Sequence, residues 1–245
     1  MRARAGMGME AIVLAVGLGT RLSGVVPDLP KPLAPVAGRP FLSFVLDALD
    51  AGGFDTVVLA VGHRAQAIRD CYGERYGTMR LAYSVESTPL GTGGAIALAL
   101  RQTSGAEVFV LNGDTFVELD FGAMRALHAR EAERLTMAAQ AVDDAGRYGT
   151  LDVRGDHVHA FVEKGRSGPG LINAGVYLLR RDLLGADAVP DAFSFETDFL
   201  MPRAAAIRPR AFRTRGLFID IGVPEDYARA QAMLAALGSG PVASS

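Results

Sequence analysis

The sequence has no tryptophan and only one cysteine, Cys71, in 245 residues. A lone cysteine excludes an intramolecular disulfide and a cysteine-rich zinc site, and it fits a reducing compartment. No uninterrupted apolar run reaches the roughly 18 residues that a membrane-spanning helix needs. The first residues, MRARAGMGM, lack the apolar core of a secretory signal. We therefore expect a cytoplasmic protein with no membrane span.

The sequence also lacks a strong excess of charge of either sign, because its formal net charge is -2. No basic run is longer than a few residues, so a nucleic-acid partner is not expected. Hydrophobic residues make up 49% of the chain and charged residues 21%, which is typical of a folded globular protein rather than a disordered one. A chain of this length can bury one α/β core.

Apolar runs typical of buried strands alternate with helix-like segments in the first half of the chain. The runs AIVLA, TVVLAV, MRLAYS and EVFVLNGD are interleaved with stretches such as PFLSFVLDALDAGG and GTGGAIALALRQ. This alternation predicts an α/β fold with a doubly wound, mostly parallel sheet. In the second half, strand-like runs follow one another with little helix between them, which predicts an antiparallel or mixed extension of the sheet. We expect one domain over residues 10–237, with flexible segments at 1–9 and 238–245.

A glycine-rich turn follows the first strand-like run, within the stretch LAVGLGTRLSGVVPDLPKPL (residues 14–33). Gly17 and Gly19 would let backbone N–H groups approach an anion closely, and Arg21 and Lys31 would supply fixed positive charge. A phosphate-bearing ligand matches this arrangement, because the mildly acidic chain would not attract an anion by its overall charge.

Two familiar phosphate-binding patterns do not fit this stretch. A P-loop requires G-x-x-x-x-G-K-[ST], which is absent, and the dinucleotide pattern G-x-G-x-x-G has Leu22 in place of its third glycine. Taken alone, the short GLG sequence is more often an ordinary turn between a strand and a helix, with Arg21 and Lys31 on the surface. The residues by themselves leave both interpretations open.

Together, LAVGLGTRL and KPLAPVAGRPFL resemble the signature of the sugar-phosphate nucleotidylyltransferases. The resemblance continues through PLGTGGA, NGD, RYG, VEK, NAGVY and FIDIGVPEDY, in the order expected for this family and over residues 10–237. Val16 departs from the pattern, because the family has glycine or alanine there. The resemblance implies a Rossmann-like, GT-A-like nucleotidyltransferase fold. It also implies transfer of a nucleotidyl group from a nucleoside triphosphate to a sugar 1-phosphate, with release of pyrophosphate.

The implied reaction uses no protein nucleophile, so the protein would position two polyanions and neutralise their charge. The resemblance gives catalytic roles to Arg21, Lys31 and Asp114. An aspartate in NGD is, read alone, more often a turn residue. With the resemblance, Asp114 and Asp220, which each end a strand-like run, would hold Mg²⁺ as the cofactor. The implied nucleotide-binding residues are Leu14, Ala15, Gly17, Gly19, Thr20, Arg21, Glu86, Gly91 and Thr92.

The resemblance implies a second set of residues for the sugar phosphate. Carboxylate and amide groups in this set would bind sugar hydroxyls, and lysines would bind the phosphate. Without the resemblance, the VEK motif would be a solvated hairpin. The set consists of Lys31, Gly149, Glu163, Lys164, Asn173 and Gly175.

The choice of base depends on Glu86, which precedes the PLGTGG motif. A carboxylate accepts hydrogen bonds from the adjacent N1–H and N2–H donors of guanine, whereas uracil and thymine offer a single N3–H between two acceptors. Glu86 therefore favours GTP, with a surface position in a turn as the alternative.

The short chain, with its FSFETDFL and FIDIGVPEDYARAQ segments, most resembles bacterial D-glycero-alpha-D-manno-heptose 1-phosphate guanylyltransferases. The expected partners are then GTP and this heptose 1-phosphate, in nucleotide-sugar synthesis for polysaccharides. Mannose-1-phosphate guanylyltransferases and short uridylyl- or thymidylyltransferases are close alternatives. A glycosyltransferase is disfavoured because such enzymes usually carry D-x-D, and the presence of Arg21, Lys31, Asp114 and Asp220 argues against a silent regulatory relative. The oligomeric state is left open, with a homo-oligomer as one option.

Overall fold

The computed structural model describes residues 8–16, 29–162, 167–185 and 189–238. Six predicted site residues lie outside these ranges, namely Gly17, Gly19, Thr20, Arg21, Glu163 and Lys164. The strands are, in chain order, β1 (Met9–Ala15), β2 (Pro35–Val36), β3 (Arg39–Pro40), β4 (Phe54–Val61), β5 (Arg75–Tyr76), β6 (Met79–Val85), β7 (Glu107–Asn112), β8 (Thr115–Val117), β9 (Leu135–Val142), β10 (Thr150–Arg154), β11 (His157–Val162), β12 (Gly170–Arg180), β13 (Arg210–Thr214) and β14 (Phe218–Asp220).

The helices are α1 (Phe41–Ala51), α2 (Ala65–Tyr72), α3 (Gly91–Ala99), α4 (Phe121–Arg130), α5 (Met201–Ile207) and α6 (Pro224–Gly238), with short helical turns η1 (Lys31–Leu33), η2 (Leu100–Gln102), η3 (Leu183–Gly185) and η4 (Phe195–Leu200). None of the helices in the described ranges is both long and apolar enough to span a bilayer. Because β1 includes Met9 and α6 includes Gly238, regular structure extends one residue beyond each end of the predicted domain.

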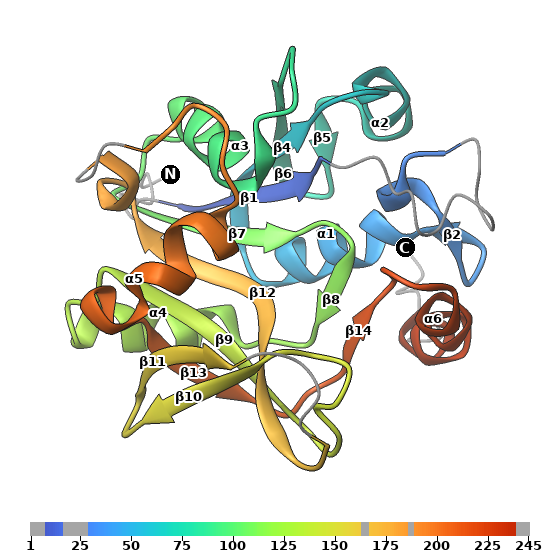
Figure 1. The fold of residues 1–245 in the computed structure, drawn as a ribbon. Coiled ribbons are helices and arrows are strands. Elements are labelled where there is room, and N and C mark those ends of the chain that lie inside the picture. Colours follow the sequence, from blue (N-terminus) through green and yellow to red (C-terminus); the bar gives the residue numbers. More distant parts are fainter. Residues whose placement is uncertain (1–7, 17–28, 163–166, 186–188, 239–245) are drawn as a thin grey trace, which may run out of the picture.

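Ten of the strands form one mixed sheet in the order β10-β11-β13-β9-β12-β7-β1-β4-β6-β5 (Figure 1). The central strands from the first half of the chain are parallel, as the sequence predicts, because β1 pairs in parallel with β4 and β7, and β4 with β6, whereas the short edge strand β5 is antiparallel to β6. The crossover helices α1 and α2 pack on one face of these strands, whereas α3 packs on the other. The winding direction therefore changes between β1 and β7. Ligands of open α/β sheets bind beyond the carboxyl ends of the strands at such a point.

The second half of the chain forms the mixed extension that its closely spaced strand-like runs predict. β12 pairs antiparallel with both β7 and β9, β10 pairs antiparallel with β11, and β13 is parallel to β9. A register shift interrupts the ladder between β12 and β9 from Asn173 to Tyr177. This irregular stretch of β12 lies beside the carboxyl end of β7, where the parallel half of the sheet ends.

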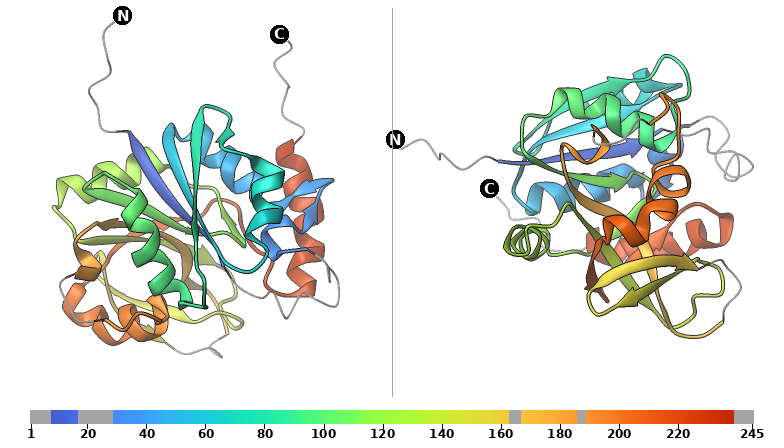
Figure 2. Two further views of the ribbon diagram at one scale, coloured as in Figure 1. Left: turned by 90° about the horizontal axis from the view of Figure 1, so that it is seen from above. Right: turned by 60° about the vertical axis from the view of Figure 1, so that its left-hand side comes forward.

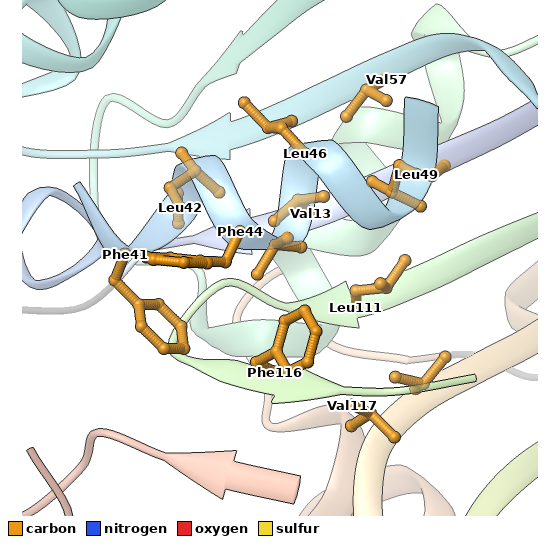
Figure 3. Packing of buried hydrophobic residues seen from close by; sticks show 14 of the residues in the cluster. Val13, Phe41, Leu42, Phe44, Leu46, Leu49, Val57, Leu111, Phe116 and Val117 are labelled. Atoms are coloured by element: carbon orange, nitrogen blue, oxygen red, sulfur yellow. The ribbon is translucent and has the colours of Figure 1, made fainter. Parts of the chain in front are cut away.

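Side chains that alternate along the central strands build a core on each face of the sheet. In β1, Ala11 and Val13 belong to the core under α1, whereas Ile12 and Leu14 belong to the core under α3. Figure 3 shows the first of these cores, in which α1 side chains such as Leu46 lie against the strands. A sheet buried on both faces holds its strand ends in fixed positions, and these ends carry the predicted site.

The last part of the chain, residues 218–238, returns to the beginning of the fold. β14 pairs antiparallel with β8, and α6 then packs beside β2 (Figures 1 and 2). There the Tyr227 hydroxyl donates a hydrogen bond of 2.5 Å to the carbonyl oxygen of Pro35. We call residues 218–238 the C-terminal arm. The arm brings the first half of α6 against the segment that follows Lys31.

Candidate active site

Asp114 and Asp220 come from distant parts of the sequence and are brought together by strand pairing. Asp114 lies in the turn between β7 and β8, and Asp220 is the last residue of β14. Because β14 pairs with β8, Asp220 lies opposite Thr115, the residue after Asp114. The amide of Ile221 also donates to the carbonyl oxygen of Asp114 at 3.0 Å. The two carboxylates that the sequence predicts as a metal site therefore meet in the fold.

Lys31 reaches the same place from the turn η1. Its Nζ donates to Oδ2 of Asp114 at 2.5 Å, and its side chain is only 15% exposed. The neighbouring Pro32 and Leu33 are buried, and the amide of Leu33 donates to the carbonyl oxygen of Pro30 at 2.8 Å. A stiff, buried backbone thus holds a compact positive charge against the Asp114 carboxylate.

The two carboxylates lie in a partly buried place and repel each other. Burial raises the pKa of Asp220, and the negative charge of Asp114 raises it further, whereas Lys31 acts in the opposite direction. A divalent cation would remove this repulsion, and carboxylate oxygens are suitable ligands for it. Over the described parts of the chain, no three His, Cys, Asp or Glu side chains converge as a metal site. The two carboxylates of Asp114 and Asp220 suit a divalent cation such as Mg²⁺, which commonly binds one or two carboxylates and completes its shell with water and substrate phosphates.

Two cavities meet at this cluster of charged residues. The larger, about 570 Å³, is lined by Asp220 and by three residues predicted for the sugar phosphate, Gly149, Asn173 and Gly175. The smaller, about 190 Å³, is lined by Asp114 and by two residues predicted for the nucleotide, Leu14 and Thr92. The two predicted sets therefore lie in adjoining cavities, and each cavity has one of the two carboxylates in its wall.

Glu196 and Asn112 line both cavities, although neither residue is among those predicted for the site from the sequence. Glu196 lies in η4, where its Oε1 accepts hydrogen bonds from the Tyr177 hydroxyl at 2.6 Å and from Nδ2 of Asn173 at 3.0 Å. Burial and the charge of Glu196 raise the pKa of Tyr177 well above its ordinary value, so this hydroxyl remains a donor. The FSFETDFL segment was the available signal, but the sequence does not show which of its acidic residues faces the site.

On the nucleotide side, Glu86 follows the carboxyl end of β6. Its amide donates to the carbonyl oxygen of Val61 at 2.9 Å, and its Oε2 accepts from the amide of Leu90 at 3.1 Å. A Cβ on Gly62 would lie 2.7 Å from Oε1 of Glu86, so the glycine leaves room for this carboxylate. Glu86 therefore has a structural contact at one oxygen, and its contact with the base stays a prediction.

The remaining predicted nucleotide-binding residues have packing contacts in the fold. Gly91 has φ +68°, and a Cβ there would lie 2.5 Å from the carbonyl oxygen of Phe193, so the chain approaches too closely for a side chain. Thr92 Oγ1 accepts from the amide of Phe195 at 2.8 Å and so fixes the start of η4. Ala15 is buried at the end of β1, and the adjacent Val16 lines the smaller cavity.

A profile of the Nucleotidyl transferase family matches residues 10–236 of the chain. The chain belongs to this family. The match confirms the predicted family, and enzymes of this family typically use a divalent cation. The site of this nucleotidyl transferase agrees with that property, since Asp114 and Asp220 offer hard oxygen donors at one place.

Individual relatives of this nucleotidyl transferase are similar over nearly its whole length. The D-glycero-alpha-D-manno-heptose 1-phosphate guanylyltransferase of Aneurinibacillus thermoaerophilus is 41% identical over 223 residues, covering 91% of this chain and 97% of the relative. The crystal structure of HddC from Yersinia pseudotuberculosis matches with a TM-score of 0.83 and 37% identity, covering 92% of this chain and 99% of that one. A structure of HddC complexed with GMP-PN matches with a TM-score of 0.82, 38% identity and the same coverage. The predicted fold class is thereby confirmed.

Gly175 gives a test of how tightly the wall of the larger cavity is packed. Its φ is +70°, and a Cβ there would lie 2.5 Å from Nδ2 of Asn112, whereas Gly155 has φ +60° with nothing within 4 Å of its Cβ position. The left-handed backbone costs about 1–2 kcal/mol with a side chain at either position. We expect Gly175→Ala to lower the free energy of unfolding in urea by more than Gly155→Ala does. Equal losses would mean that the Asn112 side chain moves aside freely.

Proposed function

We propose that the protein transfers the guanylyl group of GTP to D-glycero-alpha-D-manno-heptose 1-phosphate, with Mg²⁺ as cofactor and pyrophosphate as the second product. One observation carries the proposal: Asp114 lines the smaller cavity and Asp220 the larger, while the pairing of β8 with β14 holds them together. A cation bound by both would lie where the phosphates of two substrates meet. The heptose 1-phosphate guanylyltransferase relative supports the choice of sugar, and HddC complexed with GMP-PN supports the choice of nucleotide.

The proposed reaction is a direct displacement at the α-phosphorus of GTP. An oxygen of the sugar phosphate forms a bond to this phosphorus, while the bond from the phosphorus to the pyrophosphate oxygen breaks. The protein's part is to place the two substrates and to neutralise their charges. Lys31 would bind phosphate oxygens next to Asp114, and Arg21, which lies outside the described residues, would bind the β- and γ-phosphates. Asp114 and Asp220 would hold Mg²⁺, which would supply further charge neutralisation and orient the phosphate oxygens.

The sugar hydroxyls would be bound in the larger cavity. Tyr177 and Asn173 both donate to Oε1 of Glu196, so this carboxylate is held in a defined orientation. Its Oε2 would then accept from a hydroxyl of the sugar, because carboxylates bind such donors well. Glu163 and Lys164 stay predicted partners of the sugar phosphate. We propose that the reaction takes place in the cytoplasm, where the free and exposed Cys71 would stay reduced.

The substrates can be tested by measuring pyrophosphate release for each combination of four nucleoside triphosphates with three sugar 1-phosphates. The nucleotides are GTP, UTP, dTTP and CTP, and the sugars are the heptose, mannose and glucose 1-phosphates. We expect the highest kcat/KM for GTP with the heptose 1-phosphate. A higher value with mannose 1-phosphate would make the protein a mannose-1-phosphate guanylyltransferase. A higher value with UTP or dTTP would contradict the assignment of the base.

Glu86→Gln tests the proposed contact with guanine. The glutamine oxygen can keep the hydrogen bond from the Leu90 amide, but its NH₂ group replaces the carboxylate oxygen that guanine would require. We expect the ratio of kcat/KM for GTP to that for UTP to fall by about 5- to 150-fold, the usual cost of a mispaired polar contact in a closed site. Glu74→Gln, at an exposed position, is the matched control. An unchanged ratio in Glu86→Gln would leave Glu86 with only its contact to Leu90.

A further inference from the structure

The loop of residues 143–149, between β9 and β10, forms one wall of the larger cavity through Tyr148 and Gly149. Its first part is fastened to the segment that leads into β12. Oδ1 of Asp144 accepts from the amide of Gly168 at 3.2 Å, and the amide of the next residue donates to the carbonyl oxygen of Gly168 at 2.9 Å. The first half of the loop is therefore tied to the neighbouring strand connection.

The second half of the loop is tied to the C-terminal arm through Arg147. The Arg147 guanidinium donates to Oδ2 of Asp226, in the first turn of α6. The Asp226 side chain is 3% exposed, and its Oδ1 accepts from the Arg229 guanidinium at 2.9 Å. A buried carboxylate is thus held between two guanidinium groups. Only one of them, that of Arg147, belongs to the loop whose Tyr148 and Gly149 line the cavity.

A second contact joins the loop to the arm close to the metal-site carboxylate. The Tyr148 ring packs edge-on against the Phe218 ring, with centroids 5.9 Å apart and planes at 77°. Tyr148 and Asp220 line both the larger cavity and a neighbouring cavity of about 400 Å³. Arg147 and Asp226 also line this neighbouring cavity. The ion pair therefore lies behind a wall that the cavity shares with Asp220.

Because of these contacts, the position of the loop that lines the larger cavity depends on the arm that carries Asp220. The buried Asp226 carboxylate is stabilised by its ion pairs, and the pair with Arg147 ties the loop to the arm. If Arg147 is removed, Arg229 still pairs with Asp226, so the fold keeps its buried charge compensated. Removing Arg147 therefore releases the loop without leaving an isolated buried charge.

We propose that Arg147 and Asp226 are positioning residues. Their ion pair holds the cavity wall formed by Tyr148 and Gly149 in a fixed position relative to Asp220. The pair would hold the sugar 1-phosphate where its phosphate faces the α-phosphorus of the nucleotide. This inference rests on the proposed function, because it takes the larger cavity to be the sugar-phosphate site.

The kinetic test compares Arg147→Ala with Arg229→Ala, which removes the other ion pair to the same carboxylate. We expect Arg147→Ala to raise the KM for the sugar 1-phosphate and lower kcat/KM for it on the order of 10-fold, since small displacements of binding groups have effects of this size or larger. The KM for GTP and the Tm should stay near the wild-type values. Arg147→Lys should recover part of the loss, because it restores the charge without the planar fork. Arg229→Ala should leave both KM values unchanged.

Two outcomes would overturn the inference. Equal increases of both KM values in Arg147→Ala, or the same effect from Arg229→Ala, would indicate a general structural role. Hydrogen exchange gives a reading that does not depend on activity: Arg147→Ala should speed exchange at the amides of Tyr148 and Gly149, and Arg229→Ala should not. If the wild-type protein releases no pyrophosphate, the proposed function fails, and hydrogen exchange alone decides whether the Arg147–Asp226 pair holds the loop. Unchanged exchange at Tyr148 and Gly149 in Arg147→Ala would reject the positioning role of the pair.

Discussion

The pairing of β14 with β8 is the contact on which the site depends, because it joins two carboxylates that are about a hundred positions apart in the sequence. This short ladder places Asp220 next to the turn that holds Asp114. The same pairing directs the chain into α6, which returns to β2 and so to the segment after Lys31. One pair of three-residue strands thus connects the two carboxylates, the lysine and the wall of the larger cavity.

Electrostatics explains why these groups are kept together. Without ligands, Lys31 offsets part of the repulsion between Asp114 and Asp220, which is otherwise strong in a partly buried place. Two substrates with several phosphates would bring much more negative charge to the same place. A cation shared by both carboxylates would offset it and would free Lys31 to bind phosphate oxygens. The residues that hold the site together without ligands are therefore the ones to which the proposed reaction gives roles.

Local patterns in the sequence predict much of the fold and part of the site. Alternation of apolar runs with helices predicts the parallel half of the sheet, and the glycines, Lys31 and the strand-end aspartates can be found from short motifs.

Contacts between distant segments could not be predicted in the same way. Glu196 reaches both cavities only because Tyr177 and Asn173 hold it from a neighbouring strand. Likewise, nothing local in RYG or PEDY indicates that Arg147 and Asp226 pair. The sequence predicts that Gly91 of GTGG binds the nucleotide, yet a Cβ at Gly91 would also meet the backbone at Phe193, a contact that depends on tertiary packing.

The most direct test of a cation shared by Asp114 and Asp220 is electron paramagnetic resonance of Mn²⁺, a paramagnetic substitute for Mg²⁺, titrated in the presence of a non-hydrolysable GTP analogue. We predict that Asp114→Asn and Asp220→Asn each weaken Mn²⁺ binding by at least about tenfold, since loss of even a supporting group near a metal has an effect of this size. Asp182→Asn, at an exposed aspartate paired with Arg180, should bind Mn²⁺ as the wild-type protein does. Wild-type affinity in Asp220→Asn, with loss in Asp114→Asn, would contradict the shared site and leave the cation with Asp114 and the nucleotide alone.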